Sequence, residues 1–183
     1  MIQPRDSVLV LVDYQERLLP AIHLGAQVLA EAGRLADCAR ALGIRVVGTE
    51  QNPRGLGPNE GTIRERCETT LAKMHFDACR DGLVQALRDS GGALPTDVVV
   101  AGCETHVCLM QTALGLLRTG LRVWVVEPAC GTRTPRDHAL AIARLRQCGA
   151  QVVSREMIVF EWLGSCEHER FRAVLEFLKS PLR

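Results

Sequence analysis

The amino-acid sequence predicts an α/β fold, a three-layer α/β/α arrangement around a central, mostly parallel, Rossmann-like sheet. Short, continuous apolar segments alternate with longer segments of helical periodicity along the chain. This alternation is typical of a parallel sheet with helices on both faces. The apolar segments are continuous rather than alternating with polar residues, which indicates strands buried on both sides.

Six segments are predicted to be strands, five of them rich in apolar residues and one, residues 69–73, a short strand that carries Lys73 near its end. The first is entirely apolar and therefore central, and Asp13 follows it directly. The predicted strands are residues 7–12, 44–48, 69–73, 98–101, 121–126 and 150–153.

The predicted helices lie between and after these strands, at residues 26–42, 78–90, 109–117, 135–148, 157–163 and 168–178. Gly43 and Gly120 end two of them. Thr134 is placed as an N-cap, with Pro135 at the first helical position. Residues 50–61 are dense in Gly and Pro, which predicts a loop.

Length and composition exclude several classes of protein. With 183 residues, the chain is long enough for one well-buried core and short for two, so one domain over residues 1–183 is expected. The content of 47% hydrophobic and 23% charged residues is that of an ordinary globular protein. A net charge of +1 without a basic, aromatic-rich stripe predicts no nucleic-acid partner.

The apolar run near the N-terminus, residues 8–12, stops at Asp13 and is too short for a signal peptide or a membrane span. A cytoplasmic protein without a membrane partner is therefore expected. The eight cysteines include no paired CxxC motifs, and those outside the CETHVC segment are expected to be free thiols that pack as small hydrophobes.

Three reactive residue types fall at the carboxyl ends of predicted strands: Asp13, Lys73 and the turn CETHVC, which contains Cys108. Ligands bind at this edge in open α/β sheets, so the three are expected to converge. Cys108 lies where a strand, a tight turn and a helix N-terminus follow one another. Unpaired N–H groups at a helix end stabilise a thiolate, so Cys108 is predicted to be a nucleophile.

The sequence resembles the isochorismatase-like cysteine hydrolase family over nearly its whole length. The resemblance rests on VLVDYQERLLPAI at the first strand, LAKMHFDA around Lys73 and VVVAGCETHVCLMQTAL around Cys108. It implies a catalytic triad of Asp13, Lys73 and Cys108. It also implies a cis peptide between Cys103 and Glu104, and an oxyanion hole formed by the backbone N–H groups of Glu104 and Cys108.

Two departures from the family pattern narrow the expected reaction. Nicotinamidases of the family bind a metal through an Asp-x-His pair and a further His between the second and third strands. Residues 50–61 contain neither Asp nor His, so no metal and no other cofactor is expected. Members that cleave the vinyl ether of isochorismate typically lack the cysteine, so Cys108 favours acyl chemistry on a small amide-type substrate.

A comparison of magnitudes predicts that Lys73 is the main activator of Cys108. A helix N-terminus offers a thiolate about 0.3–1 kcal/mol. An ammonium at about 4 Å offers on the order of 4 kcal/mol before desolvation losses, at an effective dielectric constant near 20. Asp13 has two possible roles, as the general base for the thiol and as the partner that holds Lys73 in place.

Further residues near the expected site are candidates for the substrate pocket: Gln15, Gln51, Phe76, Thr105 and His106. Trp162 is a candidate either for the pocket or for a subunit contact. A homo-oligomer, a dimer or a tetramer, is expected from the resemblance. Two alternatives to the amide hydrolase stay open, a vinyl-ether hydrolase of the same fold and a non-catalytic, redox-responsive module in which Cys108 pairs with Cys103.

Overall fold

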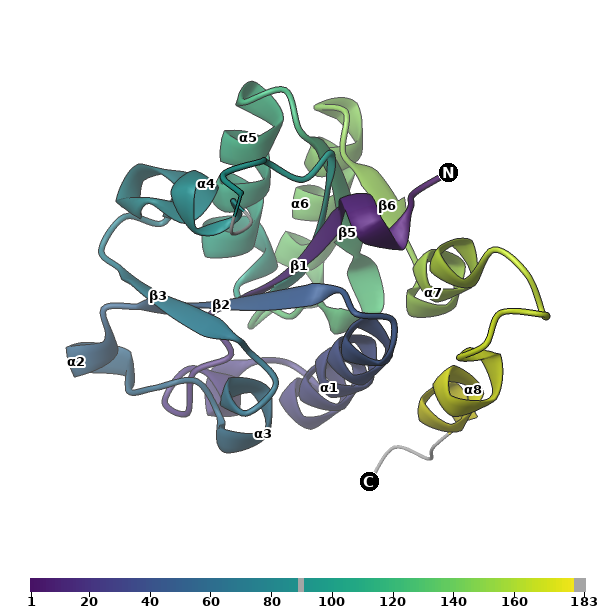
Figure 1. Ribbon diagram of the computed structural model, residues 1–183. Helices are drawn as coiled ribbons and strands as arrows, with labels where there is room; N and C mark the ends of the chain where they lie inside the picture. Colours follow the sequence, from purple (N-terminus) through teal and green to yellow (C-terminus); the bar gives the residue numbers. More distant parts are fainter. Residues whose placement is uncertain (89–90, 180–183) are drawn as a thin grey trace.

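A six-stranded parallel sheet forms the centre of the molecule in the computed structural model, which describes residues 1–88 and 91–179 (Figure 1). Every neighbouring pair of strands runs parallel, so the predicted α/β class is confirmed and the sheet is wholly parallel. The strands in sheet order are β3 (Thr69–Lys73), β2 (Arg45–Gln51), β1 (Ser7–Val12), β4 (Asp97–Gly102), β5 (Arg122–Val126) and β6 (Gln151–Val153).

Helices cover both faces of the sheet and give the three layers. On one face α1 contacts α7 and α8, and on the other α5 contacts α6, with α4 beside them (Figure 1). The helices are α1 (Gly25–Ala41), α2 (Pro53–Leu56), α3 (Gly61–Arg64), α4 (Leu83–Ala86), α5 (Met110–Arg118), α6 (Pro135–Gln147), α7 (Arg155–Leu163) and α8 (Phe171–Lys179). The shorter turns are η1 (Pro4–Asp6), η2 (Leu19–Ala21), η3 (Ala78–Asp81), η4 (Thr105–Leu109) and η5 (Glu127–Ala129).

The two central strands, β1 and β4, are buried along their whole length. This confirms the prediction that the first apolar segment is central. Each fully buried Val or Leu side chain contributes about 1.5–3 kcal/mol relative to an exposed one. The apolar runs of β1 and β4 therefore hold the two strand ends that carry the site against one another.

The strand order reverses between β1 and β4, and a crevice forms beyond the carboxyl ends of strands at such a point. Val12 and Gly102 are opposite one another in the last pair of this ladder. A Cβ atom at Gly102, whose φ is +155°, would collide with the Val12 carbonyl. Glycine thus lets β4 end directly against β1, which places Asp13 and the CETHVC turn side by side.

Two predicted elements differ from the structure. The helix predicted over residues 78–90 is divided into η3 and α4 by Gly82, whose φ of +99° is left-handed, and residues 89–90 lie outside the described part. The loop predicted over residues 50–61 begins with the end of β2 and contains α2, which starts at Pro53. In contrast, Thr134 caps α6 as predicted, because its hydroxyl accepts from the Asp137 N–H at 3.2 Å.

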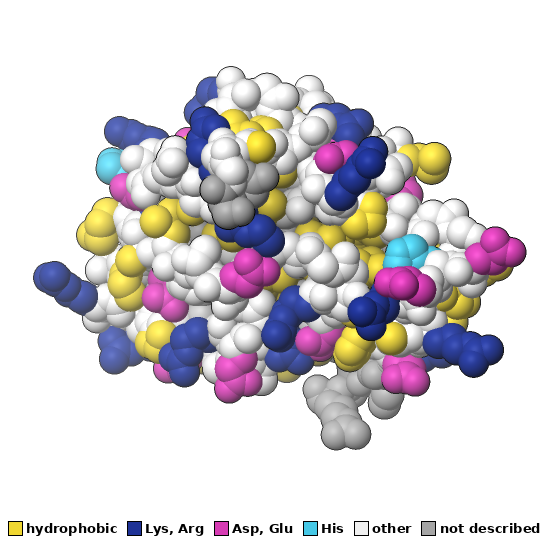
Figure 2. Space-filling model, viewed as in Figure 1, with side chains coloured by type: hydrophobic (Ala, Val, Ile, Leu, Met, Phe, Trp, Pro, Cys, Tyr) yellow, Lys and Arg dark blue, Asp and Glu magenta, His cyan; other side chains and the backbone are white. Residues whose placement is uncertain are grey.

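The surface carries charges of both signs in close mixture. On the face shown in Figure 2, Lys and Arg side chains are interspersed with Asp and Glu, and no continuous field of one sign covers it. Within the described ranges, no helix combines the length and the apolar character that crossing a membrane requires.

Candidate active site

A buried ion pair lies at the carboxyl edge of the sheet. Lys73 Nζ, at the end of β3, is 2.7 Å from Asp13 Oδ2, directly after β1, and both side chains are fully buried. The same ammonium donates to Gln51 Oε1 at 2.7 Å and to the His75 carbonyl at 3.5 Å. With three acceptors for its three protons, the Lys73 ammonium is fully satisfied without water.

The backbone at Asp13 turns sharply after β1. Its φ of +55° is left-handed, a conformation that Asp tolerates better than most residues with a side chain. Its N–H donates to the Thr49 carbonyl at 3.1 Å, and its Oδ1 accepts from the Thr49 hydroxyl at 2.6 Å. The carboxylate of Asp13 is therefore held by β2 through one oxygen and by Lys73 through the other.

Gln51 links the ion pair to the cysteine. Its Oε1 accepts from Lys73 Nζ and lies 3.8 Å from Cys108 Sγ, while its Nε2 donates to the Met74 carbonyl at 2.8 Å. Thr49 and Gln51 are two residues apart on β2, so their side chains share one face of the strand. The predicted site missed Thr49, although this spacing from Gln51 is a signal that could have identified it.

Cys108 lies in the π turn η4, just before α5, and only 6% of its surface is exposed. The Val107 and Leu109 N–H groups both donate to the Glu104 carbonyl, at 2.9 and 3.3 Å, and the Cys108 N–H between them makes no bond to that oxygen. The peptide bond between Cys103 and Glu104 is cis. Among the described residues none accepts a hydrogen bond from the Glu104 N–H. The N–H groups of Glu104 and Cys108 are therefore two backbone donors within four residues of the sulfur in sequence.

Opposing influences act on the Cys108 thiol, and its activation by Lys73 stays a prediction. Burial and the negative charge of Asp13 raise the pKa of the Cys108 thiol to about 12, and the opposing effect of Lys73 is smaller. Burial is the largest cause, because a thiolate loses its hydration there, and the Lys73 ammonium that opposes it also contacts the Asp13 carboxylate.

The remaining pocket candidates lie in different environments. The buried Gln15 side chain bonds the Gln51 backbone N–H and the Gln51 and Gly57 carbonyls, so it anchors the loop after β2 and leaves no group for a ligand. Phe76 is half exposed beside the end of β3. Thr105 is fully buried and its hydroxyl contacts Gly131 O at 3.0 Å.

The last two candidates are His106 and Trp162. His106 Nδ1 lies 2.7 Å from the Thr132 hydroxyl, so this edge of the ring is engaged within the protein. The expectation that Trp162 reaches the pocket or a subunit contact is wrong. Its ring is 2% exposed, and its Nε1 donates to the Ser7 hydroxyl at 3.2 Å, at the amino end of β1. An aromatic side chain of this size is held where both ring and N–H are satisfied.

The polar side chains that meet at the site are the Lys73 ammonium, the Gln51 amide and the Asp13 carboxylate. Among residues 1–88 and 91–179, no three His, Cys, Asp or Glu side chains are grouped so that they could hold a metal ion. Asp13, Lys73 and Cys108 together offer a proton acceptor, a fixed positive charge and a nucleophile within one water-poor cluster.

Comparisons with known proteins agree with this architecture. The profile of the Isochorismatase domain matches residues 7–157. The chain is 34% identical over 180 residues to human Isochorismatase domain-containing protein 2, covering 97% of this chain and 85% of that protein. It is 33% identical over 183 residues to mouse Isochorismatase domain-containing protein 2A, covering 99% and 86%.

Solved structures superpose closely. The MAR1 ribonuclease of Caenorhabditis elegans has a TM-score of 0.90 and 30% identity, covering 100% of this chain and 94% of that one. YcaC of Pseudomonas aeruginosa, solved with hexane-2,5-diol and covalent acrylamide, has a TM-score of 0.87 and 25% identity, covering 96% and 90%. YcaC of Escherichia coli, described as an octameric hydrolase of unknown specificity, shares the fold at 23% identity with a TM-score of 0.88, covering 97% and 88%.

Proposed function

The chain belongs to the isochorismatase-like hydrolase family, and on this basis we propose that it cleaves the C–N bond of a small amide-type substrate through a thioester on Cys108. Asp13, Lys73 and Cys108 are the proposed catalytic residues. The observation that carries the proposal is the buried Asp13–Lys73 ion pair, at 2.7 Å, and its connection to the Cys108 sulfur through Gln51 Oε1.

The first half of the reaction begins with the thiol in its protonated form. As the Cys108 sulfur attacks the carbonyl carbon, Asp13 takes the thiol proton and the C–S bond forms. During this transfer negative charge develops on the sulfur, next to the Lys73 ammonium, whose bond to Asp13 weakens as Asp13 becomes protonated. The charge passes to the carbonyl oxygen as the C–S bond is completed. The lysine charge therefore acts mainly on the transition state rather than on the resting thiol.

The second half returns the enzyme to its starting state. Asp13 gives its proton to the leaving nitrogen, the C–N bond breaks, and ammonia or an amine departs. Water then attacks the thioester carbonyl while Asp13 takes a proton from it. The C–S bond breaks, and the proton returns to the Cys108 sulfur as the carboxylic acid leaves.

The proposed oxyanion hole consists of the Glu104 and Cys108 N–H groups. Its support is that the Glu104 N–H has no acceptor among the described residues and that the Cys108 N–H is passed over by the Glu104 carbonyl. Preorganised donors of this kind typically contribute a factor of about 10²–10³ to kcat.

The alternatives are weighed on the same residues. A vinyl-ether hydrolase has no need for an acyl acceptor, so trapping an acyl-Cys108 adduct by mass spectrometry excludes it. For the redox module, burial raises the pKa of the Cys103 thiol well above its ordinary value. Such a thiol is a poor partner for disulfide exchange, because the thiolate is the attacking species.

We include two further features in the proposal, independence from metal ions and assembly into a homo-oligomer. The first rests on residues 50–61, which contain neither Asp nor His. Its test is full activity after dialysis against EDTA. The second rests on structural likeness to a protein described as octameric, and sedimentation velocity tests it.

The decisive experiment is an ammonia-release screen of small amides, including nicotinamide, carbamoyl amino acids and ureido acids. Turnover of at least one substrate is expected, with none by the Cys108→Ala variant. Circular dichroism checks that this variant folds. Retention of more than a few per cent of activity in Cys108→Ala contradicts the nucleophile assignment, and no release from any substrate contradicts the amide-hydrolase proposal.

A further inference from the structure

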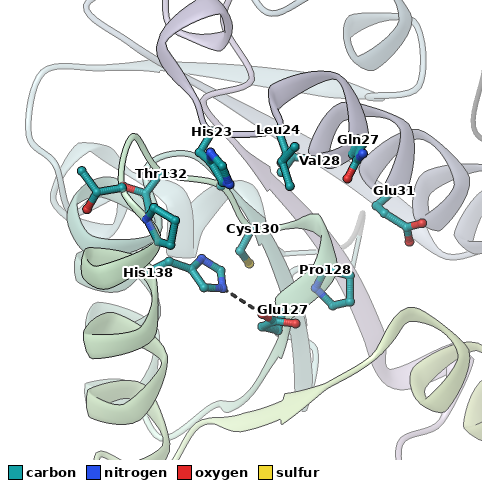
Figure 3. Close-up of a pocket in the computed structure, with 13 residues that line it drawn as sticks. His23, Leu24, Gln27, Val28, Glu31, Glu127, Pro128, Cys130, Thr132 and His138 are labelled. Atoms are coloured by element: carbon teal, nitrogen blue, oxygen red, sulfur yellow. Dashed lines mark hydrogen bonds and ion pairs between the residues drawn. The ribbon is translucent and has the colours of Figure 1, made fainter.

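A second cavity, of about 350 Å³, opens between α1, η5 and the first turn of α6 (Figure 3). Neither Asp13, Lys73 nor Cys108 lines it. Its lining includes Gly131, whose carbonyl accepts from the Thr105 N–H of the CETHVC turn at 2.8 Å. The cavity is large enough for a small organic molecule and separate from the proposed catalytic residues.

One carboxylate faces this cavity with an oxygen to spare. Glu127 Oε1 lies 2.8 Å from His138 Nε2 (Figure 3), its other oxygen takes no hydrogen bond from a described residue, and 44% of the side chain is exposed. The second carboxylate of the lining, Glu31, is already paired with Arg34 at 3.0 Å and Arg155 at 2.8 Å. No Lys or Arg lines the cavity. The free charge offered to a ligand is therefore negative.

The floor of the cavity is apolar. Val28 and Cys130 are buried beneath it, and Leu24 and Pro128 flank it (Figure 3). Burial raises the pKa of the Cys130 thiol to about 12, so the sulfur is neutral and packs as a hydrophobe. This floor suits a flat, apolar body rather than a sugar or a phosphate.

From the unpaired oxygen of Glu127 above an apolar floor, we propose that this cavity is a second binding site, for a small protonated amine with an apolar body, and that it is linked to the catalytic turn through His138. The ammonium binds the free oxygen of Glu127, and the apolar body covers Val28 and Cys130.

The link runs through two hydrogen bonds. Because Glu127 accepts from His138 Nε2, the proton of a neutral ring lies on Nε2 and leaves Nδ1 as an acceptor. The Thr105 hydroxyl lies 3.1 Å from Nδ1 and 3.0 Å from the Gly131 carbonyl, and its single proton goes to only one of the two at a time. The Thr105 N–H also donates to the Gly131 carbonyl, at 2.8 Å. Thr105 directly follows Glu104, the proposed oxyanion donor. An ammonium on the free oxygen of Glu127 draws negative charge away from the oxygen that His138 contacts, so it weakens that hydrogen bond and changes the restraint on this turn.

Binding is tested first, without any need for turnover. Calorimetry with benzylamine at pH 7.5 is compared with benzyl alcohol and benzoate, which keep the ring and change the charge. Benzylamine is expected to bind about fivefold more tightly than the alcohol, the upper range of a partly exposed charge pair. Glu127→Gln should remove this preference, and Glu169→Gln, a remote exposed control, should keep it.

Two further binding measurements test whether benzylamine binds in the cavity rather than in the active site. Alkylation of Cys108 with iodoacetamide should leave benzylamine binding intact, whereas His23→Trp, at an exposed position of the lining, should block it. Equal binding of amine and alcohol overturns the ligand class. Loss of binding on alkylation, or unchanged binding in His23→Trp, overturns the second site.

The link is tested by the rate of Cys108 alkylation in a Cys148→Ala, Cys166→Ala background, which removes the two exposed thiols. Saturating benzylamine should change this rate at least twofold, and the change should disappear in His138→Leu. An unchanged rate overturns the link to the turn. Because alkylation needs no substrate, this result is independent of whether the protein hydrolyses amides.

Discussion

Two fully buried aspartates lie at opposite ends of the central strands, and only one belongs to the proposed site. Asp13 follows the carboxyl end of β1, whereas Asp97 begins the amino end of β4. Both contact a cation, Asp13 through Lys73 at 2.7 Å and Asp97 through Arg122 at 2.6 Å. Burial of a paired carboxylate therefore does not by itself indicate catalysis.

The neighbours of the two carboxylates make the difference. Asp97 is opposite Arg122 in the β4–β5 ladder, and Trp124 Nε1 donates to its second oxygen at 2.7 Å. Its cation is half exposed, so this pair is part of the surface. In contrast, the Lys73 side chain is fully buried. Burial and the charge of Asp13 both raise the pKa of the Cys108 thiol. The proposed catalytic role of Asp13 therefore depends on its burial beside the Cys108 thiol, a neighbour that Asp97 lacks.

The largest expected effect is on turnover. Asp13→Asn removes the proposed base for the Cys108 thiol and should lower kcat/KM by about 10²–10⁴. Asp97→Asn, at the other end of the sheet, should stay within about threefold of the original protein, since its effect is confined to folding. Steady-state kinetics of the two variants on the same amide measure the contrast. Equal losses contradict the distinction between the two aspartates.

The next effect is on stability. Lys73→Met leaves Asp13 buried without a cation, which should lower the free energy of unfolding by about 3–5 kcal/mol. Urea denaturation followed by circular dichroism measures it. A loss below about 1 kcal/mol means that water or another group compensates the Asp13 charge.

A smaller effect is expected on the rate at which Cys108 is alkylated, which is measured without turnover. Asp13→Asn removes a negative charge that raises the pKa of Cys108, so a larger fraction of thiolate is present at neutral pH. Iodoacetamide should then alkylate Cys108 about tenfold faster at pH 7.5, one pKa unit being tenfold in thiolate. Mass spectrometry follows the adduct.

In the protein with Asp13 intact, the rate of Cys108 alkylation should keep rising with pH beyond pH 9. A plateau of this rate near pH 7 contradicts a neutral resting thiol.

The smallest effect is expected at the second ion pair. In Arg122→Met, Asp97 keeps its hydrogen bond from Trp124 and the lost cation is half exposed. The free energy of unfolding should fall by no more than about 1 kcal/mol. Urea denaturation, as for Lys73→Met, measures this loss. A loss as large as that of Lys73→Met contradicts the idea that burial makes the Lys73 pair more important for stability than the Arg122 pair.

Much of the fold was predictable because its signals are local. Continuous apolar runs marked the two central strands, and Thr134 with Pro135 marked the start of α6, since capping depends on neighbouring residues only. The break at Gly82 was missed because a lone glycine is tolerated inside many helices and ends one only where the backbone turns left-handed.

The candidate site was predictable in its members and less so in its environment. Asp13, Lys73 and the Cys108 turn converge because carboxyl ends of parallel strands share one edge. Gln15 was misjudged because its sequence neighbourhood does not show that its amide is consumed by the backbone around Gln51 and Gly57. The cavity beside Glu127 left no signal, since α1, η5 and α6 meet only in the folded chain.

The sequence by itself determined the α/β class, the position of each strand and the three reactive side chains at one edge. Only the tertiary structure decided the burial of Cys108, the pairing of Lys73 with Asp13 and Gln51, and the structural role of Asp97. The reason is physical. Periodicity and capping act over a few neighbouring residues, whereas burial and Coulomb interactions depend on groups that folding alone brings together.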